Sequence, residues 1–198
     1  MSITLDGNLG ITTPMYNGAV SANQVTPSVS MKNRIINGAM VIDQRNAGAA
    51  ITSNQSVNQW CPDRWQVDTD VSGKFTVQQN AGSVTPPVGF TNYLGVTSTS
   101  AYTVLSGGYQ RFQQKIEGYN IADLQWGTAN AKTITLSFWA YSSLTGTFGG
   151  AIQNSAQNRS YPFTYTISSA NTWQQISITI AGDTTGTWLT TNGTGIAI

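Results

Sequence analysis

Apolar and polar residues alternate with a period of two along most of the chain after residue 33. For example, Ile134, Leu136 and Phe138 lie at every second position, with hydroxyl-bearing residues between them. This period places successive side chains on opposite faces of a β-strand. Helical spacing is absent, apart from one short turn expected at 120–124. The sequence therefore predicts an all-β chain.

Gly, Asn, Ser and Pro separate the alternating segments, as they do between strands. The strand-like segments are 34–42, 64–67, 74–79, 93–98, 109–117, 132–141, 146–153, 161–167, 173–180 and 194–198. Many short strands with turn signals between them predict an antiparallel two-sheet β-sandwich, jelly-roll-like, over residues 34–198. A closed barrel is the alternative. The last segment resembles a strand that has only begun, so we expect the natural polypeptide to continue.

Residues 1–33 differ from the rest of the chain. They contain no Trp or Phe, and their first basic residue is Lys32. Apolar residues alternate with polar ones at the start (Ile3, Leu5, Leu9 and Ile11), and a Ser/Thr/Asn/Gly/Pro mixture follows. We interpret 1–33 as an extended N-terminal arm and linker whose first part adds a strand to another surface. A frayed terminus is the alternative.

Charge is scarce. Only 9% of the 198 residues are charged and the net charge is +1, whereas Thr, Ser, Asn and Gln together make up 77 residues. Such a surface offers no electrostatic attraction for nucleic acid or an anionic membrane, and no apolar stretch or N-terminal leader predicts membrane insertion or secretion. Histidine is absent and Cys61 is the single cysteine, so His-based catalysis, a Cys-based metal site and an intrachain disulfide are excluded.

The acidic residues do not predict an enzyme or a cofactor. Glycoside cleavage needs two carboxyl groups across a cleft, but we expect Glu117 to pair with Lys115 or Arg111, and Asp183 to cap backbone amides in its turn. Asp68 and Asp70 form a weak Ca²⁺ candidate, and a solvated strand end followed by a turn is the favoured interpretation. In the same region, we expect Asp63 and Arg64 to pair beside an inward Trp65 and to tie the 43–62 loop to the sandwich.

The run from Asn33 to Gly48, NRIINGAMVIDQRNAG, resembles the opening of the globular domain in a family of bacteriophage tail-fibre and prophage structural proteins. The tripeptides at 63–65 and 137–139, and the segment from Trp173 to Gly186, support the resemblance over 33–198. The opening ITLDG-x-x-GITTP is similar to the segment by which such fibres join the virion. A departure from the family pattern is Cys61-Pro62, where an aromatic residue often precedes Asp-Arg-Trp.

This resemblance implies a homotrimeric virion protein that is assembled in the host cytoplasm, released by lysis, and attached to other virion proteins through its arm. A tail fibre or fibre-like adhesin that recognises a host-surface glycan is the main hypothesis. A capsid decoration or head-fibre protein with a purely structural role is the alternative, and a polysaccharide depolymerase is disfavoured because no acid pair is evident.

Sugar recognition combines aromatic faces with amide and guanidinium groups. Five residues fit that chemistry and form the candidate glycan site: Trp139, Tyr141, Asn158, Arg159 and Tyr161. Alternatively, Trp139 closes the rim of the sandwich, and the binding face lies near Trp126 or Trp188. Trp60, Trp65 and Trp173 are predicted to lie in the core.

Overall fold

The chain is all-β. The computed structural model describes residues 32–198 and the strand backbones at 4–6 and 10–12, and the chain divides into two units, Met1–Asn33 and Arg34–Ile198. Every strand pair in these residues is antiparallel. Helical residues occur there only in three short 3-10 turns: η1 (Ala81–Ser83), η2 (Gly118–Asn120) and η3 (Ala122–Leu124). The predicted antiparallel, sandwich-like class is confirmed.

The described part of the first unit is one pair of strands, β1 (Thr4–Asp6) and β2 (Gly10–Thr12). Their register sets Leu5 opposite Ile11 and Asp6 opposite Gly10. The sequence predicted a strand that pairs with another surface, whereas these two strands pair with each other. Of the four apolar arm residues, Ile3 and Leu9 lie outside the described residues.

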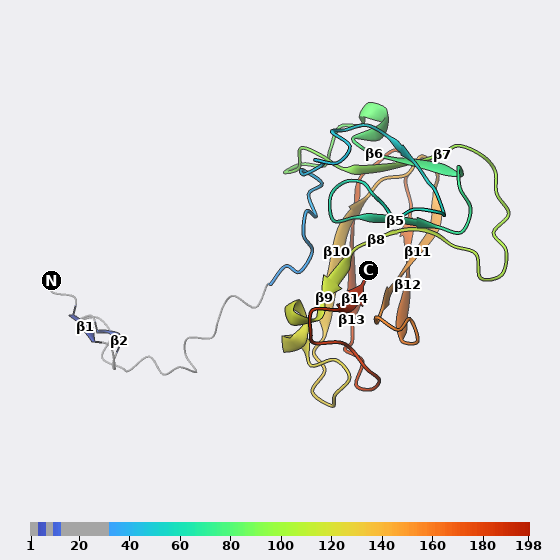
Figure 1. The fold of residues 1–198 in the computed structure, drawn as a ribbon. Coiled ribbons are helices and arrows are strands. Elements are labelled where there is room, and N and C mark those ends of the chain that lie inside the picture. The colour runs from blue at the N-terminus through green and yellow to red at the C-terminus, as the bar shows by residue number, and fades with distance from the viewer. Residues whose placement is uncertain (1–3, 7–9, 13–31) are drawn as a thin grey trace. The chain divides into compact units, whose positions relative to one another are not determined.

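In the second unit, the larger sheet pair contains β9 to β14 (Figure 1). Strands β10 (Ile134–Ala140) and β13 (Gln174–Ile180) pair along their whole length. The facing sheet has the order β12 (Ser160–Ile167), β11 (Gly146–Gln153), β14 (Thr194–Ala197) and β9 (Lys115–Glu117). Phe138 and Tyr165 meet edge to face at 5.1 Å between the sheets. The core also includes Ile116, Ile121, Leu124, Trp126, Ile152, Ile180, Trp188 and Ile196.

The smaller sheet pair lies at the other end of the second unit (Figure 1). One sheet has the order β3 (Ile51–Thr52), β6 (Phe75–Gln79) and β7 (Leu94–Ser98). The other has the order β4 (Gln59–Trp60), β5 (Gln66–Thr69) and β8 (Gln110–Gln113). Their side chains enclose a second core of Cys61, Val67, Phe75 and Val77. The sandwich layers are thus divided among four sheets.

Gln114 separates β8 from β9 and lets one stretch of chain join the two sheet pairs. The sequence predicted a single strand over 109–117 with Phe112 and Ile116 on one face. That prediction is wrong, because the break at Gln114 reverses the alternation: Ile116 is buried and Phe112 is exposed. Gln114 itself is fully buried.

The predicted strand over 34–42 is absent. Residues 36–39 form a turn, and Asn37 and Met40 have positive φ angles of 54° and 55°, which an extended strand does not allow. The Gln114 side chain replaces the missing ladder: its Oε1 accepts from the Ile36 N–H and its Nε2 donates to the Ile36 carbonyl, both at 2.8 Å. A buried side-chain amide therefore forms the backbone hydrogen bonds that a neighbouring strand was predicted to form.

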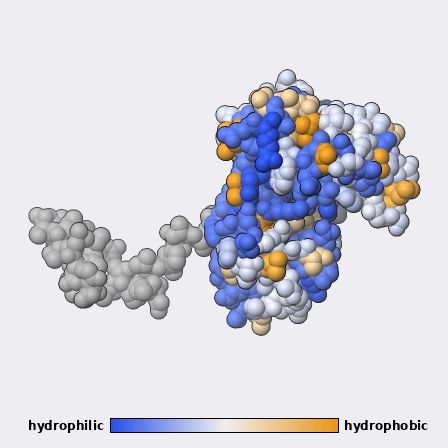
Figure 2. Space-filling view, in the orientation of Figure 1, coloured by the Kyte–Doolittle hydropathy of each residue, from blue (hydrophilic) through white to orange (hydrophobic). Residues whose placement is uncertain are grey.

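The visible face of the second unit is mostly hydrophilic or intermediate, and its apolar residues are scattered (Figure 2). Apolar side chains dispersed in this way are normal for a folded surface. In the part of the chain that the structure describes, no helix is long and apolar enough to cross a membrane.

Candidate functional site

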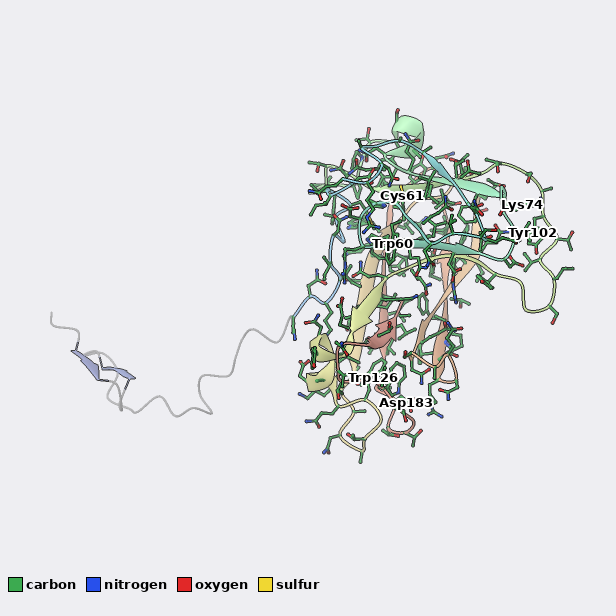
Figure 3. The ribbon with its side chains drawn as sticks, viewed as in Figure 1. Trp60, Cys61, Lys74, Tyr102, Trp126 and Asp183 are labelled. Carbon is green, nitrogen blue, oxygen red and sulfur yellow. The ribbon has the colours of Figure 1, made fainter. Side chains whose placement is uncertain are left out.

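An open cleft of about 520 Å³ lies at the end of the larger sheet pair, where Figure 3 places Trp126 and Asp183 near each other. Its walls come from the turn before β12, the start of β12, the loop after η3 and the segment after β13. The lining residues are Trp126, Asn158, Arg159, Ser160, Tyr161, Ala181, Asp183 and Trp188. Two indoles, a phenol, an amide, a hydroxyl and one ion pair thus surround the same space.

Asp183 and Arg159 form a two-pronged ion pair in the cleft wall. Arg159 Nε donates to Asp183 Oδ2 at 2.8 Å, and Arg159 Nη2 donates to Asp183 Oδ1 at 2.7 Å. The Thr185 N–H and the Trp188 indole N–H also donate to this carboxylate, at 3.0 and 3.1 Å. Mainly because Arg159 donates to it, the pKa of Asp183 lies well below its usual range. The predicted turn-capping role of Asp183 is therefore seen in the Thr185 contact.

The tryptophans form the floor of the cleft. The Trp126 and Trp188 rings meet edge to face at 4.7 Å, and both are nearly buried. The Trp126 indole N–H donates to the Lys132 carbonyl at 2.8 Å, which fixes its orientation. The aromatic floor is consequently rigid and belongs to the core cluster of the larger sheet pair.

Two glycines let the loops approach closely enough to form the cleft. A Cβ on Gly127 would lie 2.6 Å from the Gly186 carbonyl oxygen, and one on Gly186 would lie 2.9 Å from the Arg159 side chain. Both have positive φ angles, 87° and 77°. The backbone at these positions therefore requires residues without a side chain.

A buried amide fixes the turn that precedes β12. Asn154 Oδ1 accepts from the backbone N–H groups of Asn158 and Arg159, at 3.1 and 3.2 Å. Its Nδ2 donates to Asn158 Oδ1 and to the Thr187 carbonyl. Tyr161 continues the inward-facing row of β12, but it lies at the sheet end and remains 39% exposed. Asn158, Arg159 and Tyr161 are thus held at one place.

The structure separates the other two predicted glycan residues from this cleft. Trp139 lies opposite Gln175 and is 37% exposed, whereas the cleft is near the Ile134–Ile180 end of the same strand pair. Five residues of strand correspond to about 17 Å. Tyr141 packs on Trp173 at 5.3 Å, and its hydroxyl and Asn171 Oδ1 are 3.3 Å apart. The predicted set of five therefore does not form one site.

Of the tryptophans expected in the core, Trp65 is buried, while Trp60 and Trp173 are only half-buried. Trp173 is held by Tyr93 and Tyr141, and its indole N–H donates to the Thr85 carbonyl. Trp60 lines a second, smaller cleft of about 250 Å³, where the Arg45 guanidinium lies 5.6 Å from its ring centre.

The acidic residues pair differently from the prediction. Glu117 bonds to Arg64 at 3.0 Å rather than to Lys115 or Arg111, and the pKa of its carboxyl is lowered by backbone and Arg64 hydrogen bonds. Asp63 accepts from the Gln44 N–H and lies 3.5 Å from Arg45, so it ties down the 43–62 loop without Arg64. The predicted ion-pair partners were chosen because they are close in sequence, whereas the observed partners are other residues that the fold brings close in space.

The weak Ca²⁺ candidate has other partners. Asp68 Oδ2 accepts from Arg111 Nη2 at 2.8 Å, and Asp70 Oδ2 accepts from the Tyr102 hydroxyl at 2.9 Å. Over the described residues, no group of three or more His, Cys, Asp or Glu side chains is placed to hold a metal ion.

Sequence reasoning proposed Trp126 and Trp188 only as an alternative, and it missed the pairing of Arg159 with Asp183. The Gly-Asp turn signal identified the capping carboxylate, but nothing local indicated a partner 24 residues away. The fold and the cleft together define an all-β, sandwich-like protein with an open aromatic and polar cleft. The chain matches no protein-family model, no curated protein and no solved structure.

Proposed function

We propose that this chain is a bacteriophage fibre-type virion protein that recognises a host-surface glycan through the cleft at Arg159 and Tyr161. The observation that carries the glycan assignment is the cleft itself, where one exposed phenol ring lies beside fixed amide and guanidinium groups. Sugar rings bind by stacking on such faces while their hydroxyls bond to the polar groups. The virion assignment rests on the resemblance of residues 33–48.

The arm is proposed to attach the protein to other virion proteins. Support comes from the antiparallel pair β1–β2, because a two-stranded hairpin by itself is at best marginally stable in water and gains stability by docking. A homotrimer, with the arms gathered at one attachment point, completes this proposal. Sedimentation equilibrium should give the mass of three chains, and a monomer at all concentrations would contradict the trimer.

The glycan assignment is tested with Tyr161→Ala in the full chain. Loss of the exposed ring should reduce adsorption to host cells by about fivefold or more, since stacking contributes about 1 kcal/mol or more. Tyr119→Ala is the matched control, because Tyr119 is 69% exposed and does not line the cleft. Equal adsorption of both variants would exclude the cleft as the receptor site.

Antibody labelling of purified particles tests the virion assignment. Label at the tail supports a fibre, whereas label over the head supports the alternative of a capsid decoration protein. Particles without label would exclude both.

A further inference from the structure

We propose that the cleft selects uncharged sugars over carboxylated, sulfated or phosphorylated ones, and that it binds them without cleaving them. This inference rests on the proposed glycan function and names the ligand class for the same site. It follows because the two charged groups of the cleft, Arg159 and Asp183, already form hydrogen bonds within the protein.

The positive charge of Arg159 is neutralised before any ligand arrives. Two of its nitrogens already donate to Asp183, and Arg159 Nη2 also donates to the Thr185 hydroxyl. The other lining residues carry no charged side chain at neutral pH, so the formal charge of the cleft is zero. An anionic sugar would lose hydration without meeting a net positive charge.

Both oxygens of the Asp183 carboxylate also accept hydrogen bonds within the protein. Its Oδ1 accepts from Arg159 and from the N–H and hydroxyl of Thr185, and its Oδ2 accepts from Arg159 and Trp188. No oxygen remains in position to accept a proton from water or to attack a sugar carbon. It is also the only carboxylate among the lining residues, whereas glycoside cleavage uses two.

Hydrogen-bond donors that no protein group uses remain for a ligand. Asn158 uses its Oδ1 to accept from Asn154, and its Nδ2 makes no hydrogen bond within the described chain. The same holds for Arg159 Nη1 and for the Ser160 hydroxyl beside it. These groups and the Tyr161 ring match sugar hydroxyls and an apolar sugar face.

The test measures binding to a glycan array. The array carries oligosaccharides of glucose, galactose, mannose and N-acetylglucosamine, together with matched glucuronate, galacturonate and sialylated ones. The full wild-type chain should bind at least one neutral probe about tenfold better than its acidic counterpart, and raising the salt concentration should change that binding by less than about twofold. The bound neutral probe should be recovered intact by mass spectrometry.

Asp183→Asn is the diagnostic variant, because it frees the Arg159 charge. Acidic probes should then gain about threefold or more in binding and become salt-sensitive. If Asp183→Asn fails to fold, two other measurements still test the ligand class. They are the salt dependence of wild-type binding and the variant Arg159→Gln, which should bind acidic probes more weakly than the wild type does.

Preferential, salt-sensitive binding of acidic probes by the wild type would overturn the ligand class and leave the adhesin proposal intact. Cleavage of a neutral probe would overturn the claim that the cleft binds sugars without cleaving them. Failure to bind any probe, or binding that Tyr161→Ala leaves unchanged, would overturn the glycan function and this inference together.

Discussion

Asp183 connects three segments that are distant in sequence. Its carboxylate bonds to Arg159 and Trp188, and its backbone carbonyl accepts from the Gly127 N–H at 2.7 Å. Asp183 therefore holds the turn before β12 through its side chain, and the loop after η3 through its backbone, against the segment after β13. Its neighbours could not be deduced from local patterns, because hydrogen bonds over such sequence separations depend on the completed fold.

Asp183→Asn should lower the free energy of unfolding by about 1–2 kcal/mol near pH 7, the discounted value of a partly exposed charged pair. The pKa of Asp183 is lowered in the folded state, so its stabilising contribution is present above the unfolded carboxyl pKa of about 3.9 and is lost as the pH falls towards the folded value. Denaturant unfolding measured from about pH 7 to pH 3 should show that wild type and variant differ in free energy of unfolding, and that this difference becomes smaller only at the acid end.

Asp123→Asn is the control for that series. Asp123 pairs with Arg34 at 2.7 Å, but its side chain is 52% exposed, so removing its charge should cost less than about 1 kcal/mol. If the two variants lose equal stability, the network around Asp183 has no special structural role.

The Cys61 thiol should react only slowly with alkylating reagents in the folded protein. Cys61 is fully buried, and burial raises the pKa of its thiol to about 11, with the nearby Asp43 carboxylate adding to the shift. The thiolate is the reactive form, so iodoacetamide near pH 8 should modify the native chain at least about a hundredfold more slowly than the unfolded chain. Mass spectrometry of the time course measures this, and rapid native labelling would contradict the burial.

At the scale of elements, alternation predicted most strands of the larger sheet pair. The segments at 132–141, 146–153, 161–167 and 173–180 coincide with β10 to β13 to within about two residues. It failed at 34–42 and at Gln114, where a buried amide takes over the role of a neighbouring strand. Periodicity records which face is apolar, but it cannot show which backbone groups a side chain will satisfy.

Gln114→Leu should therefore destabilise the second unit more than an ordinary polar-to-apolar change. It removes the two part-buried hydrogen bonds to the Ile36 N–H and carbonyl, at a cost of about 1 kcal/mol for each. Gln175→Leu is the matched control, because Gln175 is exposed on β13 and its replacement should change stability by less than about 0.5 kcal/mol. Thermal unfolding of both variants compares them, and similar melting temperatures would show that Gln114 is dispensable.

At the scale of the whole molecule, the scarcity of charge and the abundance of hydroxyl and amide groups agree with the mostly hydrophilic or intermediate visible face of the second unit. The same composition could not locate the cleft, because it forms where three separate segments meet. Chemistry alone did select Asn158, Arg159 and Tyr161 from one short stretch, since residues near in sequence remain near in space. Trp139 was grouped with them only by residue type.

The two units should be separable in function. Both described hydrophobic cores lie within 34–198, so deleting residues 1–33 should leave a protein whose melting temperature changes by less than about 2 °C. Without β1 and β2 the shortened chain should fail to join particles assembled in infected cells, since the arm is proposed to supply the attachment. Complementing a phage that lacks the protein with full-length or shortened chain, and blotting purified particles, measures incorporation; normal incorporation of the shortened chain would exclude the arm as the attachment segment.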